Sequence, residues 1–276
     1  MQQDLNNEKS AAVAAVKSFM TSLSHKQPPF PEARQIVLSD SFCVLSHPDE
    51  LWVNTIEKTM TRVEGKVGKL LESGAKDFEE AFFEPGPDVW LYDNLAAVWA
   101  GYRVIVDSNE VSRGINAVSL MNTAEGWQIV GIADTQFQRH SVLPPVSSDL
   151  LPDVMKPIEV FFAHLKNREW DSMLSMLFPG SGITNSRQNR PIQRTWPELI
   201  EYLKGVVEGV PADIVVEEKI YDVELRTCGD LAIVWTPFTV TYNDVPASKG
   251  VNIFTLLKRD EGWVITGCQD TSRPVK

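Results

Sequence analysis

His47 lies in the segment Ser46-His47-Pro48-Asp49, where the proline biases the preceding residue away from a helix and predicts a turn. An imidazole has an unperturbed pKa of about 6.5, so a histidine can accept and return a proton at neutral pH. The other three histidines fall on predicted helices or in a predicted linker, and we expect them to be exposed and without a role. The alternative for His47 is a loop histidine in solvent or at the rim of a pocket.

Two asparagines could hold an oxygen atom of a ligand. Asn116 and Asn252 lie on predicted strands, each in a row of apolar residues. An amide donates a hydrogen bond at any pH, whereas a carboxylic acid must first hold its proton. A polar side chain in an apolar row needs a partner, which is either a ligand in a pocket or neighbouring backbone or the other domain. Their presence at equivalent places in both halves favours the structural alternative.

Other polar and aromatic side chains could contact a ligand. The segment of the second half that matches the surroundings of His47 is 180–187, which has no histidine but offers Thr184, Asn185 and Arg187. These side chains bind polar or anionic groups and are poor bases. In the first half, the aromatic residues that could line a pocket are Trp90, Tyr92 and Tyr102. Aromatic residues on strands are, however, more often part of a core.

Motifs for other kinds of chemistry are missing from the sequence. No spacing of carboxylates and histidines suggests a metal site, no glycine-rich phosphate loop follows a strand, and no Ser, His and Asp set fits a motif. Cys43, Cys228 and Cys268 are too few and too scattered for a disulfide framework, and we interpret them as buried apolar residues. We therefore expect neither a metal nor a cofactor.

The elements that must position these side chains occur twice. The stretch 94–135 lies on 230–271 after a shift of 136 residues, without a gap and with 16 identities in 42 positions. A repeat of this length changes the expected number of domains. We predict a first domain over 1–139, a linker rich in proline and serine over 140–153, and a second domain over 154–276.

In each half, apolar residues first recur at helical spacing and then alternate with polar residues, as they do in strands. The expected helices are 8–26, 31–38, 49–71, 154–170 and 197–207. The expected strands are 42–45, 78–83, 89–92, 95–107, 114–122, 126–135, 214–216, 220–225, 231–242, 250–258 and 262–270. Short polar turns between the last three strands of each half predict antiparallel meanders.

Charge and hydropathy limit the expected partners. The net charge of −11 argues against nucleic acid and anionic membranes, because phosphate groups are bound by clustered lysine and arginine. The polar N-terminus has no apolar signal core, and no run approaches the roughly 20 apolar residues of a membrane-spanning helix. We expect a cytoplasmic setting.

Each half resembles the nuclear transport factor 2-like (NTF2-like) superfamily, in its polyketide-cyclase (SnoaL-like) branch. The resemblance is carried by the strand Gly229–Trp235, the Gly-x-Asn strands at Gly114 and Gly250, and the closing segment Glu261–Thr271. It implies an α+β fold of two tandem, cone-like domains, in which N-terminal helices pack in a curved antiparallel sheet and a pocket opens at one end. Members often pair sheet to sheet. We therefore predict that the two domains pair as an intramolecular pseudo-dimer in a monomeric chain, which light scattering can test.

The resemblance also implies roles for two residues. In the isomerase branch the base is an aspartate just before a proline, and His47 takes that position here. The oxyanion donor of that branch lies on the penultimate strand, where Asn116 and Asn252 stand. Two functions remain open. One is a cofactor-free isomerase, dehydratase or cyclase that acts on a hydrophobic polyketide- or terpenoid-like molecule, and the other is a non-catalytic binding or assembly module.

Overall fold

The computed structural model describes residues 2–187, 190–211 and 214–275. The chain folds into two units, residues 1–144 and 145–276. Each unit combines helices with one antiparallel-rich sheet, which is the predicted α+β class.

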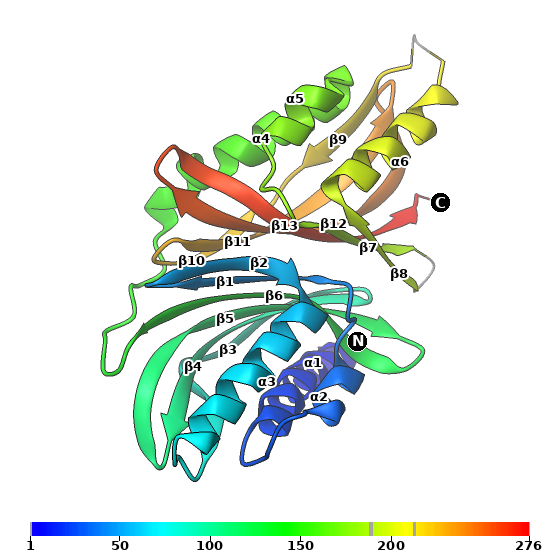
Figure 1. Ribbon diagram of the computed structural model, residues 1–276. Coiled ribbons are helices and arrows are strands. Elements are labelled where there is room, and N and C mark those ends of the chain that lie inside the picture. The colour runs from blue at the N-terminus through cyan, green and yellow to red at the C-terminus, as the bar shows by residue number, and fades with distance from the viewer. Residues whose placement is uncertain (1, 188–189, 212–213, 276) are drawn as a thin grey trace. The chain divides into compact units, whose positions relative to one another are not determined.

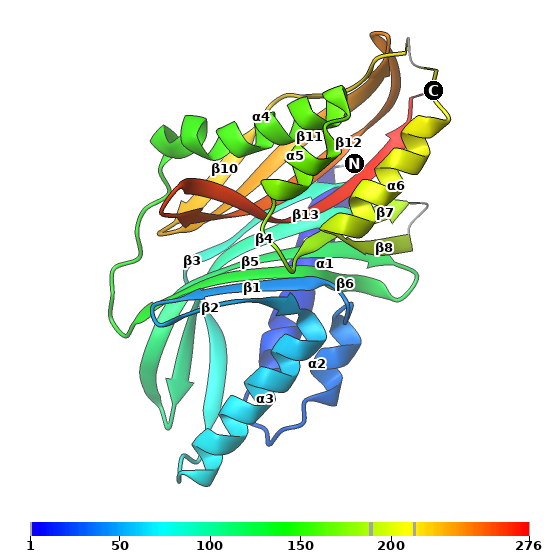
Figure 2. The same ribbon diagram turned by 45° about the horizontal axis from the view of Figure 1, so that its top comes forward.

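The first unit packs three helices on one side of a curved sheet (Figures 1 and 2). The helices are α1 (Gln2–Leu23), α2 (Pro31–Ile36) and α3 (Ile56–Glu72). The strands are β1 (Phe42–His47), β2 (Glu50–Thr55), β3 (Phe78–Tyr92), β4 (Leu95–Val106), β5 (Asn109–Thr123) and β6 (Gly126–Gln138). Their order in the sheet is β2-β1-β6-β5-β4-β3, and only the β1–β6 pair is parallel.

The second unit repeats this plan. Its helices are the short 3-10 helix η1 (Ser148–Leu150), α4 (Leu151–Asn167), α5 (Trp170–Ser175) and α6 (Trp196–Glu208). Its strands are β7 (Gly182–Arg187), β8 (Arg190–Thr195), β9 (Val216–Ile220), β10 (Glu224–Cys228), β11 (Leu231–Tyr242), β12 (Val245–Arg259) and β13 (Gly262–Pro274). The order is β10-β11-β12-β13-β7-β8, with β9 also paired to β11 and with β7 parallel to β13.

The predicted meanders are confirmed, and turn chemistry explains their register. The hairpin between β4 and β5 turns at Asp107 and Ser108, and that between β11 and β12 turns at Asn243 and Asp244. All four residues have positive φ, between 47° and 65°. Two consecutive positive φ values suit the right-handed twist of the flanking strands, which favours tight two-residue hairpins.

The predicted helix over 49–71 is wrong at its start. Residues 50–55 form β2, which pairs with β1 from Phe42↔Thr55 to His47↔Glu50, and α3 begins only at Ile56. The hydroxyl of Thr55 caps α3 by accepting a hydrogen bond from the amide of Lys58 at 3.4 Å. The segment is a short edge strand that runs directly into an amphipathic helix, so its apolar residues were counted as the first turns of that helix.

The same correction applies to the second unit. Residues 190–195 form β8 beside β7, although no strand was predicted there, and Thr195 caps α6 in a reciprocal pair with Glu198. The predicted strand 220–225 is also wrong, because β9 ends at Ile220 and β10 begins at Glu224. Asp222, at a φ of 45°, lies in the break between them.

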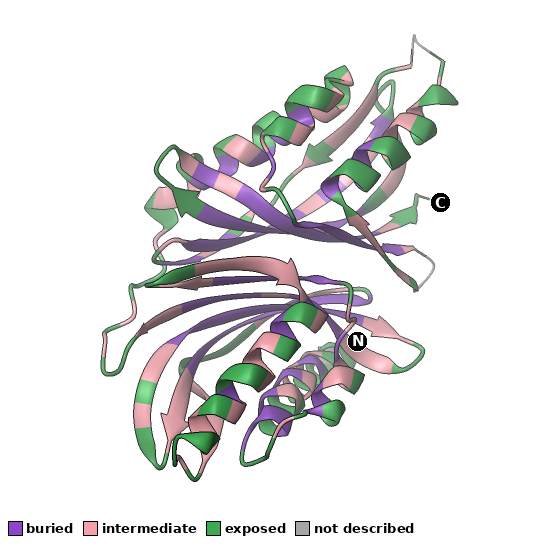
Figure 3. Cartoon of the chain, viewed as in Figure 1, coloured by how far each residue is buried: buried purple, intermediate pink, exposed green. Residues whose placement is uncertain are grey.

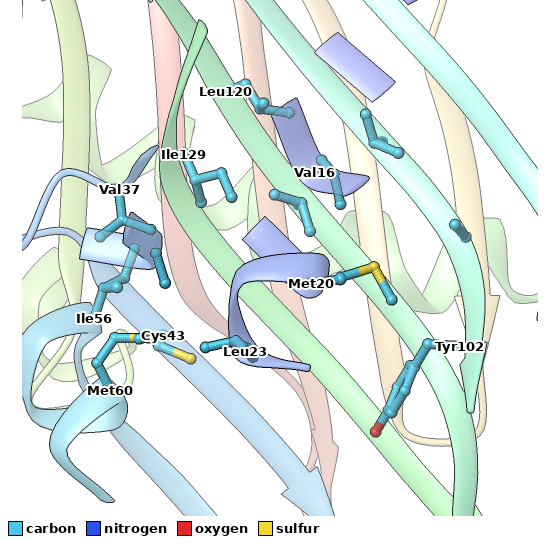
Figure 4. Packing of buried hydrophobic residues seen from close by; sticks show 14 of the residues in the cluster. Val16, Met20, Leu23, Val37, Cys43, Ile56, Met60, Tyr102, Leu120 and Ile129 are labelled. Atoms are coloured by element: carbon cyan, nitrogen blue, oxygen red, sulfur yellow. The ribbon is translucent and has the colours of Figure 1, made fainter. Parts of the chain in front are cut away.

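The core of each unit lies between its helices and the concave face of its sheet. In the first unit, Val16, Met20 and Leu23 of α1 pack with Met60 of α3 and Cys43 of β1 (Figure 4). Colouring by burial shows the central strands buried along most of their length, while the outer faces of the helices are exposed (Figure 3). Burial of one helical stripe against a sheet face is the usual source of stability for such layers.

The repeated Gly-x-Asn motif has a steric cause. A Cβ atom on Gly114 would overlap the carbonyl oxygen of Thr135 and lie 2.8 Å from Cε1 of Tyr102. A Cβ on Gly250 would overlap the carbonyl of Thr271 and lie 2.7 Å from Cζ of Phe238. Glycine is therefore required at both positions, because an aromatic ring of the neighbouring strand crosses each of them.

Candidate functional site

A cavity of about 550 Å³ opens in the first unit between its helices and the concave face of the sheet. Because successive side chains of a strand point to opposite faces, each strand contributes every second residue. From β1 these are Cys43, Leu45 and His47, and from β6 they include Asp134. Most of the remaining lining is apolar and comes from α1, α3 and the sheet: Val16, Phe19, Met20, Leu23, Ile56, Met60, Val63, Val67, Leu70, Phe78, Val104, Val118 and Ile132.

His47 is held by a buried aspartate. β1 runs parallel to β6 with Leu45 beside Asp134, which brings the next inward residue of β1 to that carboxylate. The Nε2 atom of His47 lies 3.0 Å from Oδ1 and 3.2 Å from Oδ2 of Asp134. Both side chains are largely buried, at 16% and 12% exposure. A carboxylate in this position fixes the tautomer and orientation of the ring.

Tyr102 supports the same aspartate from β4. Its hydroxyl donates to Oδ2 of Asp134 at 3.1 Å and lies 3.2 Å from the carbonyl oxygen of Thr135. Burial, with Asp134 and Glu80 nearby, raises the pKa of the Tyr102 hydroxyl well above its ordinary value. Tyr102 therefore keeps its proton and acts here as a hydrogen-bond donor.

A glutamate–asparagine pair faces the cavity beside His47 and Asp134. The amide Nδ2 of Asn116 on β5 donates to Oε1 of Glu80 on β3 at 3.1 Å. Burial raises the pKa of the Glu80 carboxyl from 4.5 to about 7, and Asp134 adds to the rise, while the Asn116 hydrogen bond and His47 oppose it. A carboxyl group with a pKa near neutrality can both give and take a proton under physiological conditions.

Cys43 lines the cavity without being a nucleophile. Burial and the nearby Asp134 raise the pKa of its thiol, and the thiol form is a poor nucleophile. At the other side of the cavity, Arg62 bonds Glu50 and lies over the ring of Trp52 at 5.0 Å. These contacts brace β2 against α3.

The second unit holds a cavity of about 430 Å³ at the equivalent place. Asn252 Nδ2 donates to Oε1 of Glu218 at 2.7 Å, which repeats the pair formed by Asn116 and Glu80. Burial raises the pKa of Glu218 to about 7 as well, although its hydrogen bond with Asn252 opposes the rise. Asp270 occupies the place of Asp134.

The partners of Asp270 differ from those of Asp134. Its Oδ2 accepts from Nη2 of Arg187 at 2.8 Å, and its Oδ1 accepts from Asn185. Arg194 in turn donates to Oδ1 of Asn185 at 2.9 Å. Phe238 lies where the first unit has Tyr102, and therefore has no hydroxyl to offer.

Strand register identifies the counterpart of His47. Cys43 lies beside Ile132 in the first unit, and Ile183 lies beside Cys268 in the second. Counting along the two strands, Arg187 takes the place of His47. The sequence comparison offered Arg187 only as one polar residue of a matching segment, because β1 and β7 lie outside the ungapped repeat and are offset from it.

The structure does not bring all predicted site residues together. His47, Asn116 and Tyr102 line the first cavity, whereas Trp90 and Tyr92 lie on the far part of β3 and are not among its lining residues. In the second unit Arg187 lines the cavity. Asn185 and Asn252 reach it through Asp270 and Glu218, while the fully buried Thr184 alternates to the other face of β7.

Sequence reasoning missed two of the polar groups in each cavity. Asp134-Thr135 and Asp270-Thr271 are identical in the repeat, and a buried, repeated aspartate was the available signal. Glu80 and Glu218 lie before the ungapped repeat begins, so no alignment connected them. Only the sheet register shows that both stand opposite equivalent valines, Val104 and Val240.

No protein-family model and no curated protein matches this chain. Solved structures do match, each over about half of it. A protein of unknown function with a cystatin-like fold from Nostoc punctiforme PCC 73102 is 12% identical, and the match covers 48% of this chain and 96% of that one with a TM-score of 0.39. A candidate dehydratase of the NTF2-like family from Streptomyces avermitilis is 12% identical. That match covers 47% of this chain and 99% of the other, with a TM-score of 0.38.

A third match is Aln2 from a Streptomyces species, at 9% identity, 47% and 93% coverage and a TM-score of 0.39. Several of the matching structures are described as NTF2-like or cystatin-like proteins, and most of those compared have no known function. These similarities concern the fold of a half chain and bear on neither substrate nor activity.

Two further searches of the described residues gave no site. Among residues 2–187, 190–211 and 214–275, no group of three or more His, Cys, Asp or Glu side chains is arranged to hold a metal ion. Within the same ranges, no helix combines the length and the apolar character needed to cross a membrane.

Proposed function

We propose that the first unit is a cofactor-free acid/base site that acts as an isomerase, dehydratase or cyclase on a hydrophobic, polyketide- or terpenoid-like small molecule. One observation carries this proposal: His47, paired with Asp134, and the Glu80 carboxyl face the same largely apolar cavity. Removing a proton from carbon while an oxygen is protonated or hydrogen-bonded requires a base and an acid in the same cavity.

The proposed step assigns one proton to each group. With Nε2 bonded to Asp134, the other ring nitrogen of His47, Nδ1, removes a proton from carbon next to a carbonyl, and Asp134 stabilises the resulting imidazolium. Protonated Glu80 donates to the oxygen on which charge develops. In an isomerisation the proton returns to another carbon, and in a dehydration Glu80 instead protonates a departing hydroxyl group, which leaves as water.

Asn116 takes a different part from the one that the resemblance implied. Its amide donates to Glu80, so it orients the acid, and Glu80 itself is the donor to the ligand. The lining supports an apolar ligand, because a cavity of about 550 Å³ lies within the usual range of roughly 300–1,000 Å³ for small-molecule sites. The apolar walls also keep water from the carboxyl, which maintains its raised pKa.

The proposal can be tested without the natural substrate. 2-Tetralone is an apolar cyclic ketone whose acidic α-protons exchange with deuterium from D2O when a base removes them. We expect the wild-type protein to accelerate this exchange above the buffer rate, and His47→Gln to lower the acceleration at least about a hundredfold, the lower end of what a positioned base contributes. Mass spectrometry of the recovered ketone measures the rate.

A matched control is available in the same unit. His25 and Asp77 form a histidine–aspartate pair at 2.9 Å, but the pair is exposed and does not line the cavity. His25→Asn should therefore exchange at the wild-type rate. The proposal fails if wild type does not exceed the buffer rate, or if folded His47→Gln exchanges as fast as wild type.

A further inference from the structure

The second unit keeps the glutamate–asparagine pair of the first but has an arginine, a permanent cation, where the first unit has a histidine. Arg187 occupies the place of His47, and a guanidinium does not release its proton in proteins. Although burial opposes the charge, Asp270 keeps the pKa of Arg187 above its ordinary value. This position can bind a group but cannot exchange a proton with it.

The arginine still has donors to offer. A guanidinium carries five N–H donors, and the bonds to described residues use two of its nitrogens, Nη1 toward the carbonyl of Ser186 and Nη2 toward Asp270. The side chain is 37% exposed, while Asp270 is 7% exposed and has both oxygens engaged by Arg187 and Asn185. Within the described residues these two bonds leave the other N–H donors of Arg187 for a ligand, and both oxygens of Asp270 are engaged.

The remaining charged lining also favours an anion. Lys166 and Arg168 line the same cavity, and Lys166 is held by Glu217 at 2.7 Å. Glu218, the other acid of the lining, has a pKa raised to about 7 by burial and is largely protonated below neutrality. A carboxylate placed here would meet an arginine with free donors and a carboxyl group able to donate its proton in a hydrogen bond.

The mouth of the cavity is apolar and exposed. Four of its lining residues are large hydrophobic side chains with 38% to 49% exposure: Tyr202, Val206, Val215 and Tyr242. We call these four residues the apolar rim. The guanidinium of Arg194 lies 4.0 Å from the centre of the Tyr202 ring and holds that ring in place. Exposed apolar side chains gathered around a cavity are typical of a ligand-binding site.

From these contacts we infer that the second unit binds, without catalysis, an apolar small molecule that carries a carboxylate, with the carboxylate on Arg187 and the skeleton against the apolar rim. This inference does not depend on the proposed activity of the first unit. It assigns different work to the two copies of one fold: proton transfer in one and anion binding in the other.

The test uses two probes of the same shape, 2-naphthoate and the neutral 2-naphthalenemethanol, titrated into the full chain by calorimetry. Wild type should bind 2-naphthoate at least about tenfold more tightly than the alcohol. Arg187→Gln should weaken the binding of 2-naphthoate at least about tenfold and change the affinity for the alcohol less than about twofold, because only the carboxylate uses the guanidinium.

A second variant keeps the test valid if Arg187→Gln does not fold. Val206→Glu adds a negative charge to the apolar rim on an exposed helical face, and should weaken 2-naphthoate about threefold to tenfold by repulsion. Its matched control is Val245→Glu, since Val245 is 66% exposed and does not line the cavity. Unchanged 2-naphthoate binding in Val206→Glu, or equal affinity of wild type for acid and alcohol, overturns the inference.

Discussion

Around Asp134 and Asp270, the two units have three polar positions in common and differ at three others. The shared positions are Glu80 and Glu218, Asn116 and Asn252, and Asp134 and Asp270. The differing positions are His47 and Arg187, Tyr102 and Phe238, and Leu45 and Asn185. Every difference lies around the aspartate.

The polar residues near each aspartate include a pair that is repeated in both units and a residue that is replaced. The asparagine–glutamate pair recurs in both units, and in each it gives a partly buried carboxyl a hydrogen-bond donor. The residue that faces the aspartate is His47 in the first unit and Arg187 in the second. We propose that this difference decides whether the carboxylate supports a proton carrier or only balances a charge.

The largest effect is expected where the two units are most alike. Gly114→Ala and Gly250→Ala should each destabilise the protein by about 3 kcal/mol or more, because the new Cβ overlaps a backbone carbonyl and presses on an aromatic ring. Gly65→Ala in α3 is the control, since its Cβ meets nothing within 4 Å, and it should stabilise by roughly 0.5–1 kcal/mol. Urea unfolding measures all three. A mild effect of Gly114→Ala beside a severe effect of Gly250→Ala would show that the motif does not serve the same purpose twice.

The two partly buried glutamates, Glu80 and Glu218, should make stability depend on pH. The folded pKa of Glu80, about 7, lies above the ordinary 4.5, so the folded state holds a proton that the unfolded state loses. This costs stability progressively as pH rises from about 4.5 to 7, and by roughly 3 kcal/mol above 7. Glu80→Gln keeps the acceptor for Asn116 and removes the charge.

We therefore expect Glu80→Gln to be more stable than wild type by about 1–3 kcal/mol at pH 8 and no more stable at pH 4.5. Glu218→Gln should behave in the same way, because the pKa of the Glu218 carboxyl is also raised to about 7. Glu72→Gln, on the exposed end of α3, should change stability by less than about 0.5 kcal/mol. The measurement is the urea midpoint at the two pH values. A gain that is equal at both would contradict the raised pKa.

A smaller effect should follow from exchanging the aromatic residues. Tyr102→Phe gives the first unit the residue of the second and removes one hydrogen bond to Asp134, which should cost about 1 kcal/mol of stability. The exchange of 2-tetralone should slow roughly tenfold, since Asp134 is then less well held. Phe238→Tyr should leave exchange unchanged. Exchange at the wild-type rate by folded Tyr102→Phe would mean that the hydroxyl does not support the histidine–aspartate pair.

Much of the fold could be predicted from the sequence. The ungapped repeat predicts two α+β units, and the alternation of 95–107, 114–122 and 126–135 predicts the meander that β4, β5 and β6 form. The short hairpins at β2 and β8 could not be found, because each joins a helix directly at its capping threonine, Thr55 or Thr195. Six residues are too few for alternation to outweigh the helical pattern that follows.

Less of the candidate site could be predicted. His47 and Asn116 were identified by type and position, but their partners Asp134 and Glu80 lie 87 and 36 residues away in sequence. Such pairs arise from strand register, which the local pattern does not specify. Trp90 lies on the same strand as Glu80 but beyond the irregularity between Phe83 and Asp88, which changes the register, and it is not among the lining residues of the cavity.

We propose that the residue facing the aspartate decides the chemistry of each unit. The most direct test gives the first unit the residue of the second: His47→Arg, assayed by deuterium exchange into 2-tetralone beside wild type and His25→Asn. Arginine keeps a charged partner for Asp134 and removes the proton carrier. The account predicts that His47→Arg falls to the buffer rate while His25→Asn retains the wild-type rate. Exchange at the wild-type rate by folded His47→Arg would contradict it.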